Sequence, residues 1–495
     1  MARKVTALTL SLPTRPAGTS LYRWFYEELR SAILEGRLHP GARLPATRDL
    51  SQSYRISRAT VIAAFEQLKS EGYVEGRIGS GTYVTHVLPD TLLQVGRVRQ
   101  QEQLPHRRVS FSLYARRLPP FRPMRLRPVR AFRANEPALD QFPTTLWAQV
   151  AARRLRRVSA QLLAGGDPLG YRPLREAVAE YLNTSRGVKC TADQVLIVSG
   201  AQEGLDRTAR VLLNAGQSVW MEEPGYPGAA VVFRALGARI CRVPVDSEGL
   251  NLKYAIRQWA TGRLVYVTPA HQFPLGVTMS LRRRLELLEW ARRSGTLIFE
   301  DDYDSEYRYS GRPVPALQGL DRAGVVIFAG SFTAVLFPAL RLGYLVVPND
   351  MVDIFAAAES VSTHHPPLLE QAILCDFIAE GHFARHVRRM RELYADRLSL
   401  LLEGAREKLG DSLEISNVEA GLQTVGWLKN TMRSERVAAA AEREGVEVVP
   451  LNRYAFGRAR KDGLILGFAA VEPHELRRGL DRLAKAINSV RANTP

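Results

Sequence analysis

The stretch from Leu297 to Pro348 constrains the fold of this 495-residue chain more than any other part of it. It contains two short, continuous apolar runs rich in β-branched and aromatic residues, which indicate buried parallel strands. Polar residues follow each run: Glu300–Asp302 after Leu297–Phe299, and Gly330–Thr333 and then Arg341 after Val325–Phe328. Open α/β sheets bind ligands beyond the carboxyl ends of their strands. A carboxylate from one strand end, with a hydroxyl and a guanidinium from the next, therefore predicts a site for a ligand with a basic ring nitrogen and a phosphate.

The same stretch resembles the pyridoxal phosphate (PLP) core of the fold-type I aminotransferases. The resemblance is strongest to the aminotransferase-like half of the MocR-type bacterial regulators, a branch of the GntR superfamily. It implies that Asp301 pairs with the pyridine nitrogen of PLP and that Tyr303 bonds the ring hydroxyl. It also implies that Ser331 and Arg341 hold the phosphate.

The lysine that holds PLP covalently in this family is missing from the motif. The chain reads SFTAVLFPALRLGY where the family pattern is similar to TFSKTLFPALRLGY, so Ala334 occupies the position of the Schiff-base lysine. The nearest lysines along the sequence are Lys253 and Lys408. An aminotransferase needs this lysine to hold the cofactor and to move a proton, and loss of a general base alone costs about 10²–10⁴-fold in rate. We therefore predict an inactive aminotransferase-like domain, in which PLP, where it binds, is held without a covalent bond.

Further residues of the implied cofactor site lie at other strand ends. VLIVSG at residues 195–200 reads as a strand, and Ala201 opens a helix. Free N–H groups and the helix dipole attract phosphate at such a turn, which comprises Ser199, Gly200, Ala201 and Gln202. Glu203 is expected to point away from a bound anion. The resemblance implies that Tyr226, in MEEPGYPGA, stacks on the cofactor.

Two positions depart from the pattern of the aminotransferases. Phe273 stands where an asparagine bonds the ring hydroxyl, and Ile465 stands where an arginine clamps the substrate carboxylate. An apolar side chain does not replace a bidentate guanidinium.

Three alternatives for the function of the pocket stay open: a pocket that senses PLP or a PLP–amino acid adduct, a pocket for another phosphate-bearing ligand, and an empty scaffold for dimerisation.

Residues 20–85 predict a winged helix-turn-helix. Apolar spacing and capping residues indicate helices over residues 20–36, 47–54 and 58–70, with Thr47 and Ser57 as N-caps of the last two, followed by two short strands around a glycine-rich turn. The motifs GRLHPGARLPATRDLS and ISRATVIAAFEQLKSEGYVEGRIGSGTYV resemble the GntR DNA-binding domain. A recognition helix enters the major groove with its N-terminal turn. The predicted DNA-binding residues are Arg43, Thr47, Arg48, Ser57, Arg58, Thr60, Arg77, Gly79 and Ser80.

Positive charge is concentrated at the N-terminal end of the chain. The net charge is +18, and residues 1–140 hold 23 Lys and Arg against 11 Asp and Glu. By itself this excess fits either a polyanion partner or a solvated basic surface, and the winged helix-turn-helix indicates double-stranded DNA as that partner. Residues 86–130 are rich in Arg and Pro and show little periodicity, so we expect a long, partly extended linker. Its arginines form either a solvated tether or additional nonspecific phosphate contacts.

Composition bounds the remaining alternatives. Three cysteines stand far apart without metal-ligand spacing, so we expect no disulfide framework and no metal site. The sequence has no run of about 18 apolar residues and no signal-peptide pattern, so we expect a cytoplasmic protein without a membrane partner. The predicted α/β organisation has a winged helix-turn-helix at residues 15–85, a linker at 86–130 and a fold-type I aminotransferase-like domain at 131–490. Its small C-terminal part is expected to begin at about residue 350.

The combined prediction is a DNA-binding transcription regulator. Its aminotransferase-like half is expected to dimerise and to sense PLP or a related small-molecule effector. The resemblance implies a head-to-tail homodimer. The competing class is a PLP-dependent aminotransferase fused to a DNA-binding module, and Ala334 argues against it.

Overall fold

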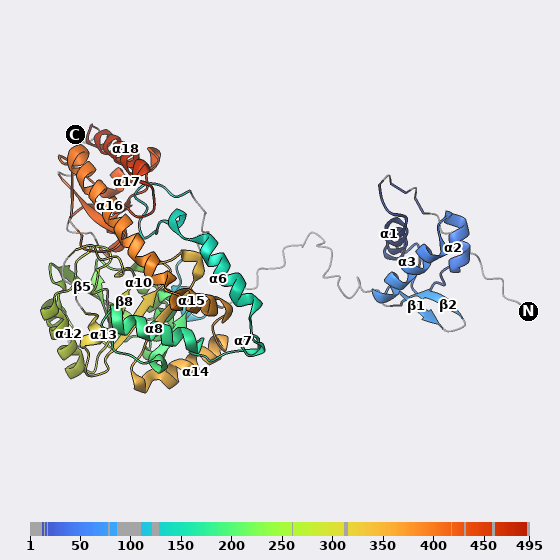
Figure 1. Ribbon diagram of the computed structural model, residues 1–495, viewed down its shortest axis with the longest axis horizontal. Helices are drawn as coiled ribbons and strands as arrows, with labels where there is room; N and C mark the ends of the chain where they lie inside the picture. The colour runs from blue at the N-terminus through green and yellow to red at the C-terminus, as the bar shows by residue number, and fades with distance from the viewer. Residues whose placement is uncertain are drawn as a thin grey trace, which may run out of the picture. The chain divides into compact units, whose positions relative to one another are not determined.

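The protein forms two compact units, which divide between Val109 and Ser110 (Figure 1). The computed structural model describes residues 12–13, 15–16, 18–77, 80–86, 110–120, 128–259, 261–310, 315–416, 418–429, 432–457 and 461–492. Each unit has its own buried apolar core. The predicted domain boundaries at residues 85, 130 and 490 remain predictions.

The N-terminal unit combines helices with a two-stranded antiparallel sheet, as predicted. Its elements are α1 (Leu21–Leu34), α2 (Thr47–Tyr54), α3 (Arg58–Ser70), β1 (Val74–Arg77) and β2 (Gly81–Val84). The hydroxyl of Ser57 accepts the N–H of Thr60 at 3.1 Å, which confirms the predicted cap of α3. The predicted cap of α2 is wrong. Thr47 is the first helical residue, and Ala46 holds the cap position without a side-chain hydrogen bond.

The core of this unit lies between α1 and α3. Val61, Phe65 and Leu68 recur at helical spacing on α3, and all three are buried. They pack with Phe25 and Leu29 of α1 in one apolar cluster. Burying each such side chain stabilises the fold by about 1.5–3 kcal/mol, so this stripe fixes the exposed face of α3.

An eight-stranded sheet forms the centre of the larger unit. The strand order is β3-β10-β9-β8-β7-β4-β5-β6. Neighbouring strands are parallel, except that β10 runs antiparallel to β3 and β9 and β6 runs antiparallel to β5. The strands are β3 (Val195–Val198), β4 (Ser218–Glu223), β5 (Arg239–Asp246), β6 (Gly249–Leu250), β7 (Leu264–Val267), β8 (Leu297–Asp302), β9 (Val326–Ser331) and β10 (Gly343–Val346).

The two strands predicted from Leu297–Phe299 and Val325–Phe328 are confirmed as the parallel pair β8 and β9. Alternate side chains enter different cores, because successive strand residues point to opposite faces. Phe299 and Ile327 pack with residues of α9 (Ala201–Leu212), α10 (Pro227–Ala235) and α14 (Val352–Thr363). Ile298 and Val326 pack with residues of α11 (Leu252–Gln258), α12 (Leu281–Ser294) and α13 (Leu317–Leu320). Helices therefore cover both faces of the sheet.

The helices of the larger unit run along the whole chain from residue 113. They are α5 (Leu113–Arg117), α6 (Thr144–Arg156), α7 (Ala160–Ala164), α8 (Arg172–Ser185), α9 (Ala201–Leu212), α10 (Pro227–Ala235), α11 (Leu252–Gln258), α12 (Leu281–Ser294), α13 (Leu317–Leu320), α14 (Val352–Thr363), α15 (Leu369–Ala379), α16 (His382–Leu409), α17 (Ser434–Arg443) and α18 (Pro473–Ala492). Short 3₁₀ turns span Leu139–Gln141, Ala192–Gln194, Pro338–Leu340, Asn349–Met351 and Leu451–Tyr454.

The C-terminal part of this unit has a small sheet of its own. Its antiparallel strands are β11 (Leu413–Ile415), β12 (Gln423–Leu428), β13 (Val449–Pro450) and β14 (Gly463–Gly467), in the order β11-β12-β14-β13. Helix α18 packs against both α16 and α17 at this end of the unit (Figure 1). The small part is joined to the large one by Tyr309, whose N–H donates to the carbonyl of Glu419 at 2.7 Å.

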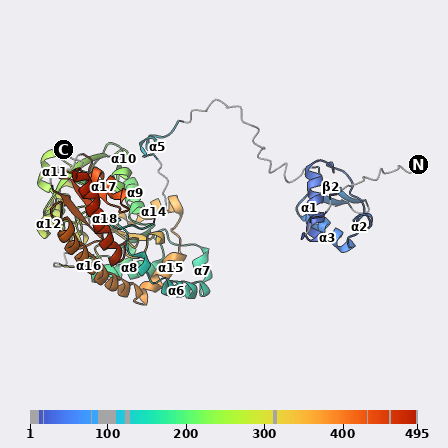
Figure 2. The same ribbon diagram turned by 90° about the horizontal axis from the view of Figure 1, so that it is seen from above.

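A helix lies inside the segment predicted as a linker. Most of that segment, residues 87–109 and 121–127, lies outside the described residues, but α5 packs against α10 (Figure 2). The guanidinium of Arg210 lies 5.0 Å from the ring centre of Tyr114 and donates a hydrogen bond of 3.0 Å to its hydroxyl. Five residues are too few to show a helical period, so the sequence did not predict α5.

Candidate ligand cavity and DNA-binding face

A cavity of about 250 Å³ opens at the carboxyl ends of β3, β4, β7, β8 and β9. It lies where the sequence places polar residues beyond strand ends. Its walls are Asn135, Gly200, Ala201, Gln202, Tyr226, Tyr266, Thr268, Phe273, Asp301, Tyr303, Ser331, Thr333, Ala334 and Arg341. The structure thus brings together eight of the nine predicted cofactor residues, all except Ser199, and adds Ala334 at the lysine position.

One end of the cavity is suited to an anion. Gly200 caps the first turn of α9, and a methyl group added to it would lie 3.8 Å from the guanidinium of Arg341. The free N–H groups of Ala201 and Gln202 therefore lie beside a cation. Arg341 has no acidic partner among the described residues, and its φ of 50° puts it in the left-handed region. Non-glycine residues in that region concentrate at functional sites.

Ser199 is set back from this end of the cavity. Its N–H donates to Oε2 of Glu203 at 2.5 Å, and Oε1 of Glu203 accepts from Arg207 at 2.7 Å. Arg207 also pairs with Glu359 of α14 at 2.6 Å. Glu203 thus faces away from the cavity, as expected. Through its hydrogen bond with Ser199, it fixes the turn that carries Gly200.

Asp301 marks the other end of the cavity. Its Oδ2 accepts a hydrogen bond of 2.6 Å from the phenol of Tyr266, whereas its buried Oδ1 has no partner among the described residues. Burial raises the pKa of Asp301 to about 6. Asp301 pairs in register with Ala329, and Ser331 lies two residues further along β9. Two residues along the strand and one strand spacing across therefore place the Cα atoms of Asp301 and Ser331 roughly 8 Å apart.

Tyr303 is held from behind by a histidine. The hydroxyl of Tyr303 lies 3.0 Å from Nδ1 of His271, and the same nitrogen lies 3.0 Å from Oδ1 of Asp304. His271 and Asp304 are both buried, next to Gly421 of the small part. The phenol predicted to meet a ring hydroxyl is therefore oriented before any ligand arrives.

Aromatic rings form the remaining walls. Tyr226 donates a hydrogen bond of 3.0 Å to Oε1 of Gln202, and its ring meets that of Phe273 edge-to-face at 5.6 Å. Phe273 also meets Tyr303 and Tyr454 edge-to-face, with ring centres 5.8 and 5.1 Å apart. The position that holds asparagine in the aminotransferases is thus part of an apolar aromatic cluster.

Sequence reasoning missed four cavity residues. Thr268 follows β7 directly, so the criterion of polar residues beyond a strand end could have found it. Tyr266 looked like a core residue of a buried strand. Thr333 lies in the recognised turn but received no role, although its buried Oγ1 has no partner among the described residues. Asn135 carries no signal in the sequence that points to this cavity.

The residues present fit PLP. The free Oδ1 of Asp301 suits a protonated ring nitrogen, and Arg341 with the first turn of α9 suits a phosphate. Thr333 offers a further unused hydroxyl at the phosphate end. Ala334 brings a methyl group to the wall, so this position offers no amine. The arrangement therefore suits reversible binding.

The predicted DNA-binding residues gather on the N-terminal unit. Thr47 and Arg48 begin α2, Arg58 and Thr60 lie in the first turn of α3, and Arg77 and Ser80 border the wing turn. Arg43, Arg48, Ser57, Arg58, Arg77 and Ser80 are exposed, and Thr47 and Thr60 are half-buried. Gly79 lies outside the described residues. The predicted set thus presents mostly exposed side chains, as a groove-binding face requires.

The arginines of this face differ in their partners. Arg77 pairs with Glu75 at 2.8 Å and lies over the ring of Tyr83, and the side chain of Arg43 lies against Gly81. Arg48 and Arg58 have no ion-pair partner among the described residues. Arg55, which the sequence reasoning missed, is also exposed and ends α2 with a φ of 52°.

Comparison with known families assigns both units. Residues 128–483 match the family of class I and II aminotransferases, and residues 21–84 match the gntR family of bacterial regulatory proteins. The chain is 41% identical over 477 residues to the probable rhizopine catabolism regulatory protein MocR of Rhizobium meliloti, covering 96% of this chain and 95% of that protein.

The chain belongs to the MocR-type regulators. The regulator is also 29% identical to PdxR, an HTH-type pyridoxine biosynthesis transcriptional regulator of Corynebacterium glutamicum, over 95% of this chain and 96% of that one. Among solved structures, it is similar to LysN, the α-aminoadipate aminotransferase of Thermus thermophilus in complex with N-(5'-phosphopyridoxyl)-L-leucine. That likeness has a TM-score of 0.68 and 28% identity, and covers 73% of this chain and 93% of LysN.

These findings confirm the predicted family, the fold class and the role as a transcription regulator. The aminotransferase family to which the larger unit belongs is PLP-dependent. In the part of the chain that the structure describes, no helix is long and apolar enough to cross a membrane. The same residues hold no cluster of three or more side chains that suits a metal ion.

Proposed function

We propose that the regulator binds PLP, or a closely related phosphorylated pyridine, without a covalent bond, and that occupancy of the cavity controls its binding to DNA. One observation carries this proposal. Among the described residues, Oδ1 of Asp301 has no hydrogen-bond partner and the guanidinium of Arg341 has no acidic partner, so both are available to a ligand. Ala334, however, occupies the position where a lysine would form the covalent bond.

Each end of the ligand has its own partners. Asp301 would accept the proton of the ring nitrogen, and Tyr303 would meet the ring hydroxyl. Gly200, Ala201, Gln202, Ser331 and Arg341 would hold the phosphate, and Tyr226 would cover one face of the ring. Ser199 contributes by fixing the turn through Glu203. Charge-assisted hydrogen bonds contribute about 1.5–3 kcal/mol each, so such a set supports reversible binding.

Catalysis is not part of the proposed function. In enzymes of this fold, PLP serves as an electron sink during transamination. The amine that would exchange with the amino acid and move the proton is missing at Ala334, and Lys253 and Lys408 lie outside the cavity. The regulator is therefore expected to sense the cofactor rather than to use it.

The remaining partners follow from the family. The winged helix would contact double-stranded DNA through Arg43, Arg48 and Arg58, with the wing beside the phosphates. The larger unit would form a homodimer of the head-to-tail kind that the resemblance implies. A regulator of this kind would act in the cytoplasm, where the chromosome and PLP are both present.

Binding of PLP is tested by thermal unfolding of the full-length protein. A ligand at 100 times its dissociation constant stabilises the native state by about 2.7 kcal/mol, so PLP should raise the midpoint clearly, and inorganic phosphate should raise it less. Borohydride treatment followed by mass spectrometry should leave the protein unmodified. No stabilisation by PLP, or a trapped adduct on a lysine of the cavity region, would refute non-covalent sensing.

Control of DNA binding is tested by titrating the protein onto its own upstream DNA. The apparent dissociation constant is measured with and without saturating PLP, at fixed salt because phosphate contacts make affinity salt-dependent. A change of at least about fivefold, lost in Asp301→Asn, supports the proposal. Identical titrations in both conditions would leave the cavity without a regulatory role.

A further inference from the structure

We propose that the cavity selects ligands with a single anionic group, so that the regulator responds to PLP or pyridoxamine phosphate and discriminates against their conjugates with amino acids. This inference rests on the proposed function and specifies its ligand class. It follows from the charges that line the cavity and from the apolar residues behind one of its walls.

The charged side chains of the cavity are balanced for one anion and one cation. Among the described lining residues, Arg341 is the single cationic side chain and Asp301 the single acidic one. They lie at the two ends that the strand geometry separates. A phosphorylated pyridine matches both, because its phosphate meets Arg341 and its ring nitrogen meets Asp301. A carboxylate on the ligand would be a second anionic group, and among the described lining residues it would find no cationic side chain besides Arg341, which already meets the phosphate.

An apolar cluster lies behind the Phe273 wall. Val425, Leu451 and Ile465 pack together, and all three are buried. Tyr454 packs against this cluster and meets Phe273 edge-to-face at 5.1 Å. The path from the cavity towards the small sheet therefore runs through aromatic rings into aliphatic side chains.

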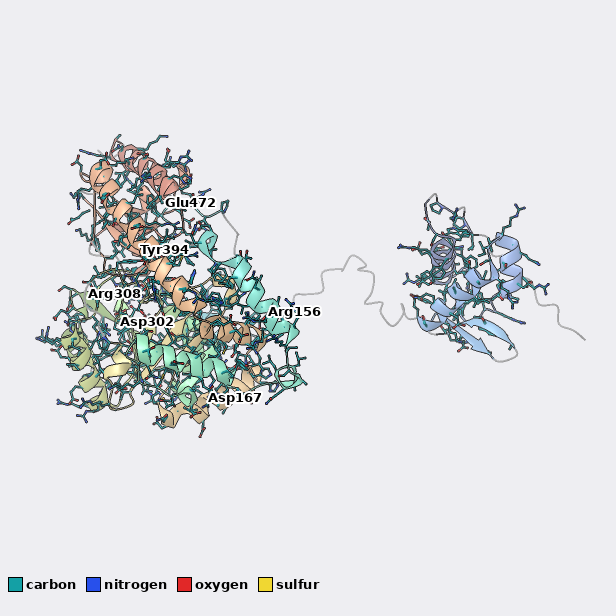
Figure 3. All side chains as sticks on the ribbon, in the orientation of Figure 1. Arg156, Asp167, Asp302, Arg308, Tyr394 and Glu472 are labelled. Atoms are coloured by element: carbon teal, nitrogen blue, oxygen red, sulfur yellow. The ribbon has the colours of Figure 1, made fainter. Side chains whose placement is uncertain are left out.

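The same cluster reaches the cavity from a second direction. Ala134 packs against it, and the next residue, Asn135, lines the cavity. Leu275, two residues beyond Phe273, packs on it as well. Two separate segments of the wall are therefore backed by apolar residues. Arg308, labelled in Figure 3, donates to the carbonyl of Ala270 at 3.1 Å, and its guanidinium is already paired with Glu419 at 2.7 Å.

A carboxylate attached to the ligand would meet this wall without a partner. Burying an unpaired charge is costly because the apolar wall cannot replace water. Even the lower range for an unsatisfied polar group, about 1–3 kcal/mol, corresponds to roughly 5–150-fold in affinity. A charged group costs more to bury than a neutral polar one, so we expect the discrimination against a ligand carboxylate to be at least about tenfold.

The test compares two ligands that differ only in that carboxylate. Phosphopyridoxyl-ethylamine and phosphopyridoxyl-L-alanine are stable secondary amines of similar size, and pyridoxamine phosphate is the reference. Dissociation constants for the full-length protein are measured by titration calorimetry. We expect the ethylamine conjugate to bind within threefold of pyridoxamine phosphate and the alanine conjugate to bind at least tenfold more weakly.

A substitution tests the wall itself. Ile465→Arg places a guanidinium behind Phe273 and should bring the affinity for the alanine conjugate to within threefold of that for the ethylamine conjugate. Ile465→Met, a matched control of similar volume, should keep the discrimination of the unaltered protein. Retained folding of each variant is checked by circular dichroism, and the ligand pair on the unaltered protein decides the question if Ile465→Arg does not fold.

The outcomes separate this inference from the proposed function. Equal affinities for the two conjugates overturn the single-anion rule but leave PLP binding intact. Weak binding of both conjugates beside tight binding of pyridoxamine phosphate shows that size, not charge, limits the cavity, and also overturns the rule. No binding of pyridoxamine phosphate or PLP refutes the proposed function instead.

Discussion

The phenol of Tyr266 donates a hydrogen bond of 2.6 Å to Oδ2 of Asp301, and this leaves Oδ1 of the same carboxyl group free at the cavity. The two residues lie on the neighbouring parallel strands β7 and β8. The bond fixes the plane of the carboxyl group, so the free oxygen faces a ligand without having to reorient. Preorganisation of this kind lowers the entropic cost of binding.

Tyr266→Phe should weaken PLP binding without changing the shape of the cavity. Burial raises the pKa of Asp301 to about 6, and the hydrogen bond from Tyr266 holds it below the value that burial alone would impose. Removing the bond raises this pKa and frees the carboxyl group to rotate. One hydrogen bond is worth about 1 kcal/mol, so affinity at pH 7 should fall about fivefold. Tyr254→Phe, at an exposed position, should bind PLP like the unaltered protein.

PLP affinity should depend on pH through Asp301. The ligand's ring proton pairs with the ionised carboxylate, so binding below the pKa of about 6 must first remove a proton from Asp301. Affinity should therefore fall by up to about tenfold for each pH unit below 6. The ligand phosphate also titrates near pH 6, so the comparison is with Asp301→Asn, whose curve should be flatter. Parallel curves for the two proteins would exclude Asp301 as the titrating group.

Asp301→Asn should raise the free energy of unfolding of the ligand-free protein at high pH. The folded-state pKa of Asp301 lies above the ordinary value of about 3.9. The folded protein thus binds more protons than the unfolded chain between about pH 4 and pH 6, and stability falls as pH rises through this window. Asparagine does not titrate, so Asp301→Asn avoids this fall in the free energy of unfolding, which is about 1–3 kcal/mol at pH 8. Urea unfolding should find little difference at pH 4 and the full gain at pH 8; an equal gain at both would point to packing instead.

Ala334→Lys should create a covalent link to PLP. Ala334 is half-buried, lines the cavity and packs on the edge of the main core. A lysine there has an amine within reach of the ligand's aldehyde. After borohydride treatment, mass spectrometry should find PLP attached to position 334, and a new absorption band should precede it. Val361→Lys, on the exposed face of α14, is the control and should trap none. An untrapped Ala334→Lys protein would mean that PLP is oriented differently.

Arg58→Ala should reduce both affinity for DNA and sequence preference. Arg58 is exposed at the first turn of α3 and has no ion-pair partner among the described residues. Loss of a bidentate contact to a base costs about 1–3 kcal/mol and relaxes specificity at that position. The measurement is a competition titration with operator and scrambled duplexes. Arg23→Ala, which removes an arginine paired with Glu27 on α1, should leave both values near those of the unaltered protein. A uniform loss on both duplexes would assign Arg58 to phosphate contact alone.

Local patterns predicted the elements of the fold well. The apolar runs at β8 and β9, and the serine before α3, are signals that act within a few residues, and the structure confirms them. The prediction of Thr47 as the N-cap of α2 failed because a hydroxyl near a helix start does not identify the cap. The cap is the residue with non-helical φ and ψ just before the first helical residue, and here that residue is Ala46. Helix α5 was missed because its stability comes from packing on α10 rather than from its own sequence.

The cavity was harder to predict than the sheet around it. Its chemistry depends on hydrogen bonds such as those of Tyr303 with His271, 32 residues apart, and of Ser199 with Glu203. These bonds determine which polar groups remain free for a ligand. A motif gives the position of Ser199, but not that its N–H is already used. The free oxygen of Asp301 likewise becomes visible only when Tyr266 is found beside it.

The first turn of helix α9 lines the cavity, and Arg210 lies near the C-terminal end of the same helix. The helix from Ala201 to Arg210 is roughly 14 Å long, and the guanidinium of Arg210 donates a hydrogen bond to the hydroxyl of Tyr114 in α5. The turn that lines the cavity and helix α5 are therefore both attached to the same rigid helix. A ligand that orders this turn would also restrict the motion of α5, without any change in the sheet.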